Sequence, residues 1–199
     1  MVDIDEQAVS ATRQHMPAHS AGAFDDPRTE LVIDDAKAWL ERYNGPPFDI
    51  MIMDLADPTD EGPCYLLYTA KFYTFCRSLL SANGLFVTQA GPAGLHTSNQ
   101  VCAPIYRTLS TVFPAVTLLV THVPSYSDTY GFCICSAQAQ PALAGRVDQL
   151  LHERLSDASV LRHLDDTTFV HLSSIPKYLR AALAAEQRII TEEAPLFIH

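Results

Sequence analysis

The 199-residue sequence lacks the features that mark several common classes of protein. It has no apolar run of the roughly 20 residues that a membrane-spanning helix needs, and its first residues show neither the basic nor the apolar segment of a secretory signal. No CxxC pair, HExxH pattern, G-x-S-x-G elbow or P-loop occurs, although there are five cysteines and eight histidines. These absences argue against a structural metal site, against serine-hydrolase chemistry and against P-loop chemistry, and they favour a reducing, cytoplasmic setting.

The sequence also has few cationic residues. Lysine and arginine number 13 against 23 aspartates and glutamates, which gives a formal net charge of -10. Such a charge disfavours nucleic acid and anionic membranes as partners, and it attracts small cationic molecules. Many cytosolic proteins are acidic for solubility alone, so the charge by itself does not select a function.

What is present is an alternation of strand-like and helix-like segments, typical of a single α/β domain over residues 1–199 with a mostly parallel sheet. The last two expected strands are separated by a short polar segment and predict an antiparallel edge hairpin. Cys133 and Cys135 lie two apart on the second of these and should share one strand face as buried thiols. The run from Phe48 to Met53 is apolar and ends at an acid, which predicts a strand buried on both faces. Strands are expected at 31–33, 48–53, 85–89, 116–123 and 130–135, and helices at 5–15, 36–43, 68–80, 100–112, 141–155 and 175–188.

Acidic and amide side chains follow the expected strands at the points where the strands end. Any one of these acids is more often a helix cap or a loop residue, but ligands in open α/β sheets bind at the carboxyl ends of the strands, so their convergence there favours a site. At those ends stand Asp3 and Asp5, Asp34 and Asp35, Asp54 and Asp57, and Gln89.

Four of these acids have positions that suit particular roles. Asp3 is placed to accept hydrogen bonds from ribose hydroxyls, and Asp35 to accept one from an exocyclic adenine amine. Asp54 can take a proton from a nucleophilic amine, and Asp57 can hold a cationic amine through charge-assisted hydrogen bonds.

The segment Asp54-Leu55-Ala56-Asp57-Pro58 resembles the D-x-x-D-P signature of the polyamine synthases, which are aminopropyltransferases. Spermidine and spermine synthases usually carry serine at the third place. Alanine there, together with the segment GPCYLLY at 62–68, resembles the thermospermine synthase branch of the family. Agreement continues over nearly the whole chain, in the stretches 24–28, 31–36, 87–94, 124–129 and 191–198.

The resemblance implies transfer of a 3-aminopropyl group from decarboxylated S-adenosylmethionine to spermidine, which gives thermospermine and methylthioadenosine. It implies a co-substrate and no permanently bound cofactor or metal, and a cationic polyamine as partner rather than nucleic acid or membrane. A monomer and a homo-oligomer both stay open. By resemblance, Asp54 is the proton acceptor, Asp3, Asp35 and Ala36 bind the nucleoside, Asp57, Gln89 and Tyr126 bind the polyamine, and residues 60–68 cover the site.

The resemblance further implies a class I methyltransferase-like Rossmann fold with strand order 3-2-1-4-5-7-6. The sequence begins at the second strand of that order, so we expect the first strand, its glycine-rich loop and the family's N-terminal β-domain to be missing. Unpaired strand edges are costly, which favours an incomplete gene product over a short protein with rearranged pairing. The alternatives for function are a spermidine or spermine synthase, an S-adenosylmethionine-dependent small-molecule methyltransferase, and an inactive truncated homologue.

Overall fold

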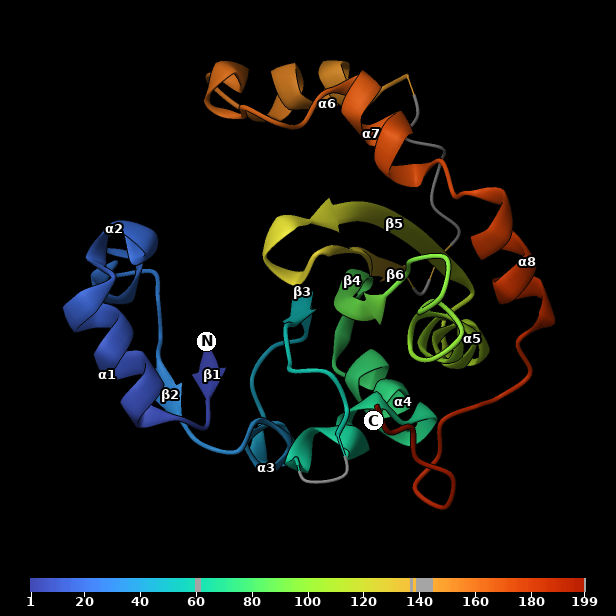
Figure 1. The fold of residues 1–199 in the computed structure, drawn as a ribbon. Coiled ribbons are helices and arrows are strands. Elements are labelled where there is room, and N and C mark those ends of the chain that lie inside the picture. Colours follow the sequence, from blue (N-terminus) through green and yellow to red (C-terminus); the bar gives the residue numbers. More distant parts are fainter. Residues whose placement is uncertain (60–61, 137, 139–144, 199) are drawn as a thin grey trace. The chain divides into compact units, whose positions relative to one another are not determined.

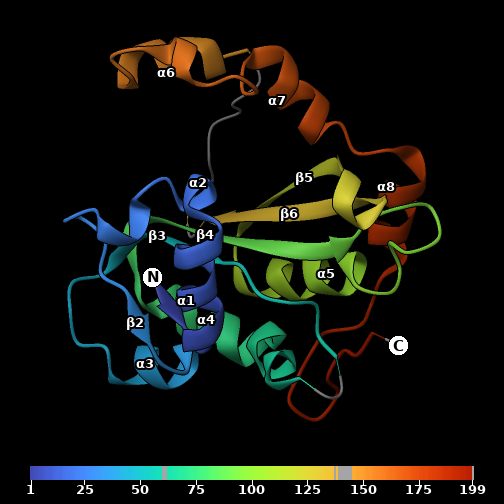
Figure 2. The same cartoon turned by 60° about the vertical axis from the view of Figure 1, so that its left-hand side comes forward.

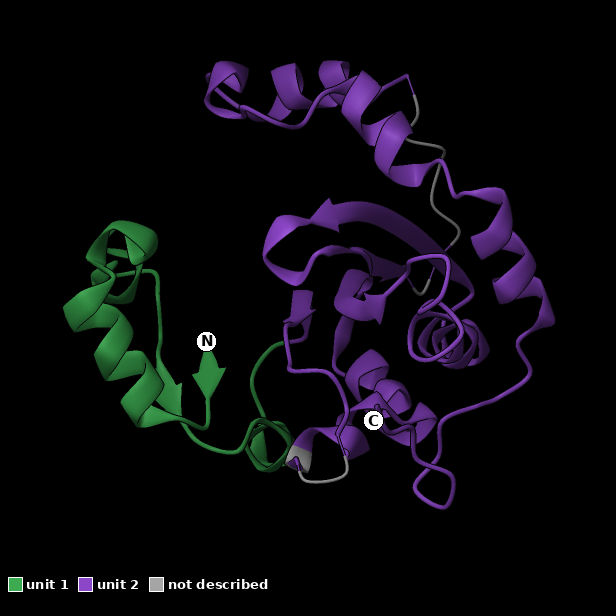
Figure 3. Cartoon of the chain, viewed as in Figure 1, with its two compact units in different colours: residues 1–46 green, residues 47–199 purple. Residues whose placement is uncertain are grey.

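The computed structural model describes residues 1–199 except 60–61, 137, 139–144 and 199. The chain forms two compact units, Met1–Pro46 and Pro47–His199, called unit 1 and unit 2 below (Figure 3). Within the described residues, no helix is long and apolar enough to cross a membrane.

Unit 1 contains two short parallel strands, and each of them leads into a helix. Val2 pairs with Val32 and Asp3 with Ile33. The elements are β1 (Val2–Asp3), α1 (Glu6–His15), α2 (Pro17–Ser20), η1 (Ala23–Asp25), β2 (Val32–Ile33) and α3 (Ala36–Arg42). Aspartates begin both longer helices: Asp5 accepts from the backbone N–H groups of Gln7 and Ala8, and Asp35 from that of Ala38. Each cap satisfies amides that have no partner within the helix.

Unit 2 is built on a four-stranded sheet in the order β3-β4-β6-β5 (Figure 1). Its strands are β3 (Phe48–Met53), β4 (Leu80–Pro92), β5 (Ala115–Val123) and β6 (Asp128–Ser136). β3 pairs with β4 in parallel, and β6 runs antiparallel to both β4 and β5. The expected edge hairpin is therefore confirmed. The order β2-β1 in unit 1 matches the part 3-2 of the expected order, and the order β3-β4-β6-β5 in unit 2 matches its part 4-5-7-6.

Two helices, α4 (Ala70–Ser78) and α5 (Cys102–Val112), pack against one face of the sheet of unit 2, and α8 (Lys177–Ala185) lies along α5 (Figure 2). The core between α4, α5 and β4 is aromatic: the ring of Phe86 lies 5.6 Å from those of Tyr73 and Phe113. Cys133 and Cys135 lie two positions apart on the same face of β6, and both are buried, as predicted. The helices are η2 (Pro63–Tyr68), α4 (Ala70–Ser78), α5 (Cys102–Val112), η3 (Pro124–Tyr126), α6 (Val147–Arg154), η4 (Ala158–Val160), α7 (Asp166–Ser173) and α8 (Lys177–Ala185).

The prediction that β3 is buried on both faces is wrong. Ile50 and Ile52 are 59% and 70% exposed, whereas Met53, on the opposite face, is 8% exposed. The packed face is the one that carries Met51, which is half-buried, and Met53; Met51 pairs in register with the buried Phe86 of β4. An apolar run shows that a strand can be covered on both sides, but the packing of other elements decides whether it is.

Several predicted boundaries also moved. The helix expected at 68–80 is α4, which begins after Thr69 because the Thr69 hydroxyl accepts from the backbone N–H of Phe72 and caps it. Leu80 already belongs to β4, whose register with β3 is irregular between Phe48 and Ile50. The start of the helix expected at 141–155 lies outside the described residues, and α7 was not predicted.

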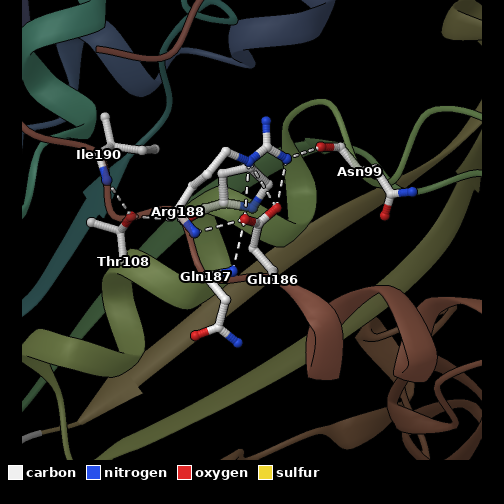
Figure 4. Close-up of polar contacts among 7 residues, drawn as sticks. Asn99, Thr108, Glu186, Gln187, Arg188 and Ile190 are labelled. Carbon is white, nitrogen blue, oxygen red and sulfur yellow. Dashed lines mark hydrogen bonds and ion pairs between the residues drawn. The ribbon is translucent and has the colours of Figure 1, made fainter. Parts of the chain in front are cut away.

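The segment after α8 runs along the outside of α5 (Figure 4). The Glu186 carboxylate, whose side chain is 7% exposed, accepts from the Arg188 guanidinium at 2.5 Å, and that guanidinium also donates to the carbonyl of Asn99. The Ile190 N–H donates to Thr108 Oγ1 at 3.0 Å. The tail then reaches the loop after β3, where the Ile198 N–H donates to the Pro58 carbonyl at 2.9 Å.

Candidate active site

Unit 2 contains a cavity of ≈ 380 Å³ where β3, β4 and the β5–β6 hairpin meet. Two carboxylates and an amide line it together with an aromatic wall. The lining residues are Asp54, Leu55, Ala56, Asp57, Gln89, Val123, Tyr126, Tyr130 and Phe132. Four residues singled out in the sequence, namely Asp54, Asp57, Gln89 and Tyr126, therefore share one cavity.

The sheet topology explains why these four residues meet. β3 and β4 are parallel neighbours, so Asp54 and Asp57, after β3, and Gln89, near the end of β4, lie at the same edge. Tyr126 lies on η3, between β5 and β6. Since β6 pairs with β4, this hairpin brings its aromatic residues beside the end of β4.

The Gln89 side chain makes four hydrogen bonds within the site. Its Nε2 lies 3.0 Å from Asp57 Oδ1, 3.1 Å from the Leu55 carbonyl and 2.8 Å from Tyr68 Oη. Its Oε1 accepts from the Gly91 N–H at 2.6 Å, which fixes the direction of the amide. Gly91 has φ +74°, and a Cβ there would come within 2.5 Å of Val101 Cγ1, so this position requires glycine.

Tyr68 supports the loop between the two carboxylates from beneath. Its ring is fully buried, and its hydroxyl donates to the Ala56 carbonyl at 2.9 Å. Burial, above all, raises the pKa of Tyr68, so the hydroxyl stays protonated and can donate. Tyr68 was predicted as part of the covering segment 60–68, but it is buried, and residues 60–61 of that segment lie outside the described part of the chain.

Tyr130 belongs to the site and was not predicted. Its hydroxyl lies 3.4 Å from Asp57 Oδ2, and its ring centroid lies 4.7 Å from that of Tyr126. Desolvation and the neighbouring Asp57 charge raise the pKa of Tyr130, which keeps the phenol neutral. The strand expected at 130–135 held a usable signal, because Tyr130 and Phe132 lie on the same face of it.

The carboxylates of the cavity differ in how they are held. Asp57 is half-buried and accepts from Gln89 and Tyr130. Asp54 is exposed and has no hydrogen bond or ion pair to the described residues. The described residues contain no group of three or more histidines, cysteines, aspartates and glutamates that could hold a metal ion.

The remaining predicted residues, Asp3, Asp35 and Ala36, form a group of their own in unit 1. Asp3 ends β1 and Asp35 follows β2, its parallel partner, so both stand at the same edge of this pair of strands. Asp3 Oδ1 accepts from the Asp5 N–H at 2.9 Å, and Asp35 Oδ1 accepts from the Ala38 N–H at 2.7 Å.

The fold and the site together define an α/β protein of the methyltransferase-like class, with an acidic and aromatic cavity at the carboxyl ends of its strands. The chain belongs to the spermine/spermidine synthase domain family, whose family model matches residues 1–144. The resemblance drawn from the D-x-x-D-P segment is thereby confirmed at the level of the family.

Known relatives cover the whole chain. A thermospermine synthase from Arabidopsis thaliana is 40% identical over 200 residues, which are 100% of this chain and 58% of that protein. A polyamine aminopropyltransferase from a Synechococcus strain is 39% identical over 204 residues, 98% of this chain and 63% of the relative. The crystal structure of a spermidine synthase from Thermotoga maritima superposes with a TM-score of 0.75 at 23% identity, over 93% of this chain and 60% of that one. The chain thus spans about three fifths of these proteins.

Proposed function

We propose that the protein is a polyamine aminopropyltransferase that uses decarboxylated S-adenosylmethionine as the donor. The observation that carries the proposal is the cavity in which Asp54 and Asp57 face an aromatic wall. Polyamines are chains of methylenes and ammonium groups. Carboxylates pair with their charges, and aromatic faces attract ammonium groups and cover methylenes.

The reaction needs one amine without its proton. The neutral nitrogen uses its lone pair to attack the methylene carbon beside the donor's sulfonium, the C–S bond breaks, and its electrons stay on sulfur in methylthioadenosine. The extra proton of the attacking amine passes to a carboxylate. Asp54 suits this step because it lies at the end of β3, lines the cavity and has its carboxylate uncommitted among the described residues.

The other predicted residues take binding roles in this proposal. Asp57, Gln89 and Tyr126 line the polyamine site, where the Asp57 carboxylate pairs with an ammonium group that does not react. Asp3, Asp35 and Ala36, at one edge of the β1–β2 pair, bind the ribose and adenine of the donor. The chemistry itself depends mainly on positioning, because the sulfonium already makes the carbon electrophilic.

The favoured acceptor is spermidine and the favoured product thermospermine. Two observations support this choice over a spermidine or spermine synthase. Ala56 stands at the third place of the D-x-x-D-P segment, and the Arabidopsis relative of 40% identity is named a thermospermine synthase. The Synechococcus relative has the broader name polyamine aminopropyltransferase, so the test compares acceptors directly.

The test is release of methylthioadenosine by the purified protein from decarboxylated S-adenosylmethionine, with putrescine, spermidine or no acceptor added. We expect release that depends on spermidine, with thermospermine separated from spermine by chromatography of the products. Putrescine as the preferred acceptor would contradict the assignment of spermidine as acceptor, and spermine as the product would contradict the assignment of thermospermine. Methyl transfer from intact S-adenosylmethionine with no aminopropyl transfer would overturn the proposal.

A further inference from the structure

Tyr68, which is buried, and Gln89, which lines the cavity, form a hydrogen-bonded pair that holds three consecutive residues of the loop after β3. Tyr68 Oη donates to the Ala56 carbonyl, and Gln89 Nε2 donates to Tyr68 Oη. The same Nε2 lies within hydrogen-bond distance of the Leu55 carbonyl and of Asp57 Oδ1. Two carbonyls and one carboxylate oxygen of the loop thus depend on a single amide and a single phenol.

The direction of the Gln89 amide is determined by its neighbours. The Gly91 N–H binds Oε1 at 2.6 Å, so Nε2 must face the loop and the Asp57 carboxylate. The two hydrogens of Nε2 serve three acceptors, all of them in the protein. Tyr68 is one of the three acceptors, and it limits how far the amide can turn.

We propose that Tyr68 is a positioning residue of the polyamine site: acting through Gln89, it sets the direction in which the Asp57 carboxylate faces the substrate ammonium. The inference rests on the proposed function for its ligand. Tyr68 is fully buried and does not line the cavity, so it acts without touching substrate. A charge-assisted hydrogen bond to an ammonium depends on geometry, and a carboxylate that turns freely loses part of it.

The chain offers a matched control for removing this hydroxyl. Tyr73 is also fully buried, but its hydroxyl finds no hydrogen-bond partner among the described residues. Tyr68→Phe and Tyr73→Phe each take one oxygen from a buried ring. Only Tyr68→Phe leaves the Ala56 carbonyl and the Gln89 amide without a partner that they have in the wild type.

The first measurement is the affinity for spermidine by calorimetry, in the wild type, both single variants, Asp57→Asn, and Asp57→Asn with Tyr68→Phe. We expect Tyr68→Phe to weaken spermidine binding about tenfold, with donor affinity changed less than twofold, and Tyr73→Phe to change neither. In the Asp57→Asn background, Tyr68→Phe should change spermidine affinity less than twofold. An equal loss with and without Asp57 would overturn the inference, because Tyr68 would then not act through that carboxylate.

The second measurement does not depend on the proposed function. Hydrogen exchange of the Gly91 amide reports the hydrogen bond that holds the Gln89 side chain. We expect this amide to exchange at least tenfold faster in Tyr68→Phe than in Tyr73→Phe, with equal rates for amides of α5. Unchanged exchange overturns the inference even if the enzyme is active. A wild type that binds no spermidine refutes spermidine as the acceptor in the proposed function, while the exchange rates still decide whether Tyr68 holds Gln89.

A second variant covers the case in which Tyr68→Phe does not fold. Gln89→Met keeps the length of the side chain and removes the amide, so Asp57 loses the same donor. We expect weaker binding of spermidine than of the donor here too, and only while Asp57 is present. If Gln89→Met still weakens spermidine binding in the Asp57→Asn background, Gln89 contacts spermidine directly. That result would overturn the inference that Tyr68 acts on Asp57 through Gln89.

Discussion

Tyr130 Oη lies 3.4 Å from Oδ2 of Asp57, across the cavity from the loop that carries the two carboxylates. This is a long contact for a hydrogen bond between oxygens, so the phenol adds little to the hold on Asp57. The ring, stacked at a tilt on Tyr126, is the larger contribution: it gives the cavity an aromatic surface beside a negative charge.

Tyr130→Ala should therefore weaken spermidine binding more than Tyr130→Phe. We expect a loss of about threefold to thirtyfold for Ala, in line with about 0.5–2 kcal/mol for a cation beside an aromatic face, and less than threefold for Phe. Calorimetric titration with spermidine measures both. Equal losses in the two variants would mean that the hydroxyl, not the ring, makes the contribution.

Asp54→Asn should abolish aminopropyl transfer while the polyamine still binds. The amide keeps the shape of the carboxylate but cannot take a proton. We expect the turnover rate to fall by about 10²–10⁴-fold, the usual contribution of a general base. Release of methylthioadenosine gives the rate. A variant that keeps more than about a tenth of the wild-type rate would remove Asp54 from this role.

Asp57→Ala and Asp3→Ala should each weaken the binding of a different ligand. The Asp57 carboxylate is proposed to pair with an ammonium, so its loss should weaken polyamine binding more than donor binding. Asp3 is proposed to bind ribose, so its loss should weaken binding of the donor. Each variant is titrated with spermidine and with methylthioadenosine; similar losses for both ligands in both variants would contradict the assignment.

Glu186→Gln should destabilise the attachment of the C-terminal segment to α5. The Arg188 guanidinium lowers the pKa of Glu186 from its ordinary 4.5, so the ionised carboxylate stabilises the fold above that pH and loses its contribution as pH falls through the lowered value. We expect a loss of about 1–2 kcal/mol at pH 7 by urea unfolding, which shrinks below pH ~4.5.

The control for this variant is Glu192→Gln, which removes a surface partner of Lys71. Exposed pairs contribute about 0–1 kcal/mol, so the loss should be smaller at pH 7. If Glu186→Gln costs no more than this control, or if its cost does not change between pH 7 and pH ~4, the ion pair with Arg188 does not stabilise the fold as proposed.

Alkaline pH should destabilise the protein through its buried thiols. Burial raises the pKa of Cys76, Cys102 and Cys135 from 9.0 to about 12. Above pH 9 the unfolded thiols lose protons that the folded ones keep, so the free energy of unfolding falls until about pH 12, by up to about 1.4 kcal/mol per pH unit for each thiol.

Urea unfolding at pH 8 and at pH ~10.5 measures this fall. Because tyrosines and lysines also ionise in the same range, the informative quantity is the difference between wild type and Cys102→Ala. The fall with pH should be shallower in the variant, although the variant is less stable at pH 8. Parallel pH dependence in the two proteins would show that Cys102 does not contribute.

The sequence alone determined the α/β class, the order of the strands, the family and four residues of the cavity. Local pattern is enough for these, because short apolar runs mark β3 and β4, and parallel strands deliver the residues after them to one edge. It also placed Cys133 and Cys135 on one face of β6, since strand periodicity does not depend on partners.

Only the tertiary structure decided which side chains hold these residues and which faces are covered. Gln89 bonds to Tyr68, 21 positions away, and Tyr130 meets Asp57 across 73 positions; no periodicity within one segment contains such pairs. The exposure of Ile50 and Ile52 likewise depends on which other elements pack against β3, and the sequence of β3 does not contain that information. Hydrogen-bond partners and burial depend on where other elements pack, and that arrangement is a property of the whole fold rather than of any one stretch of chain.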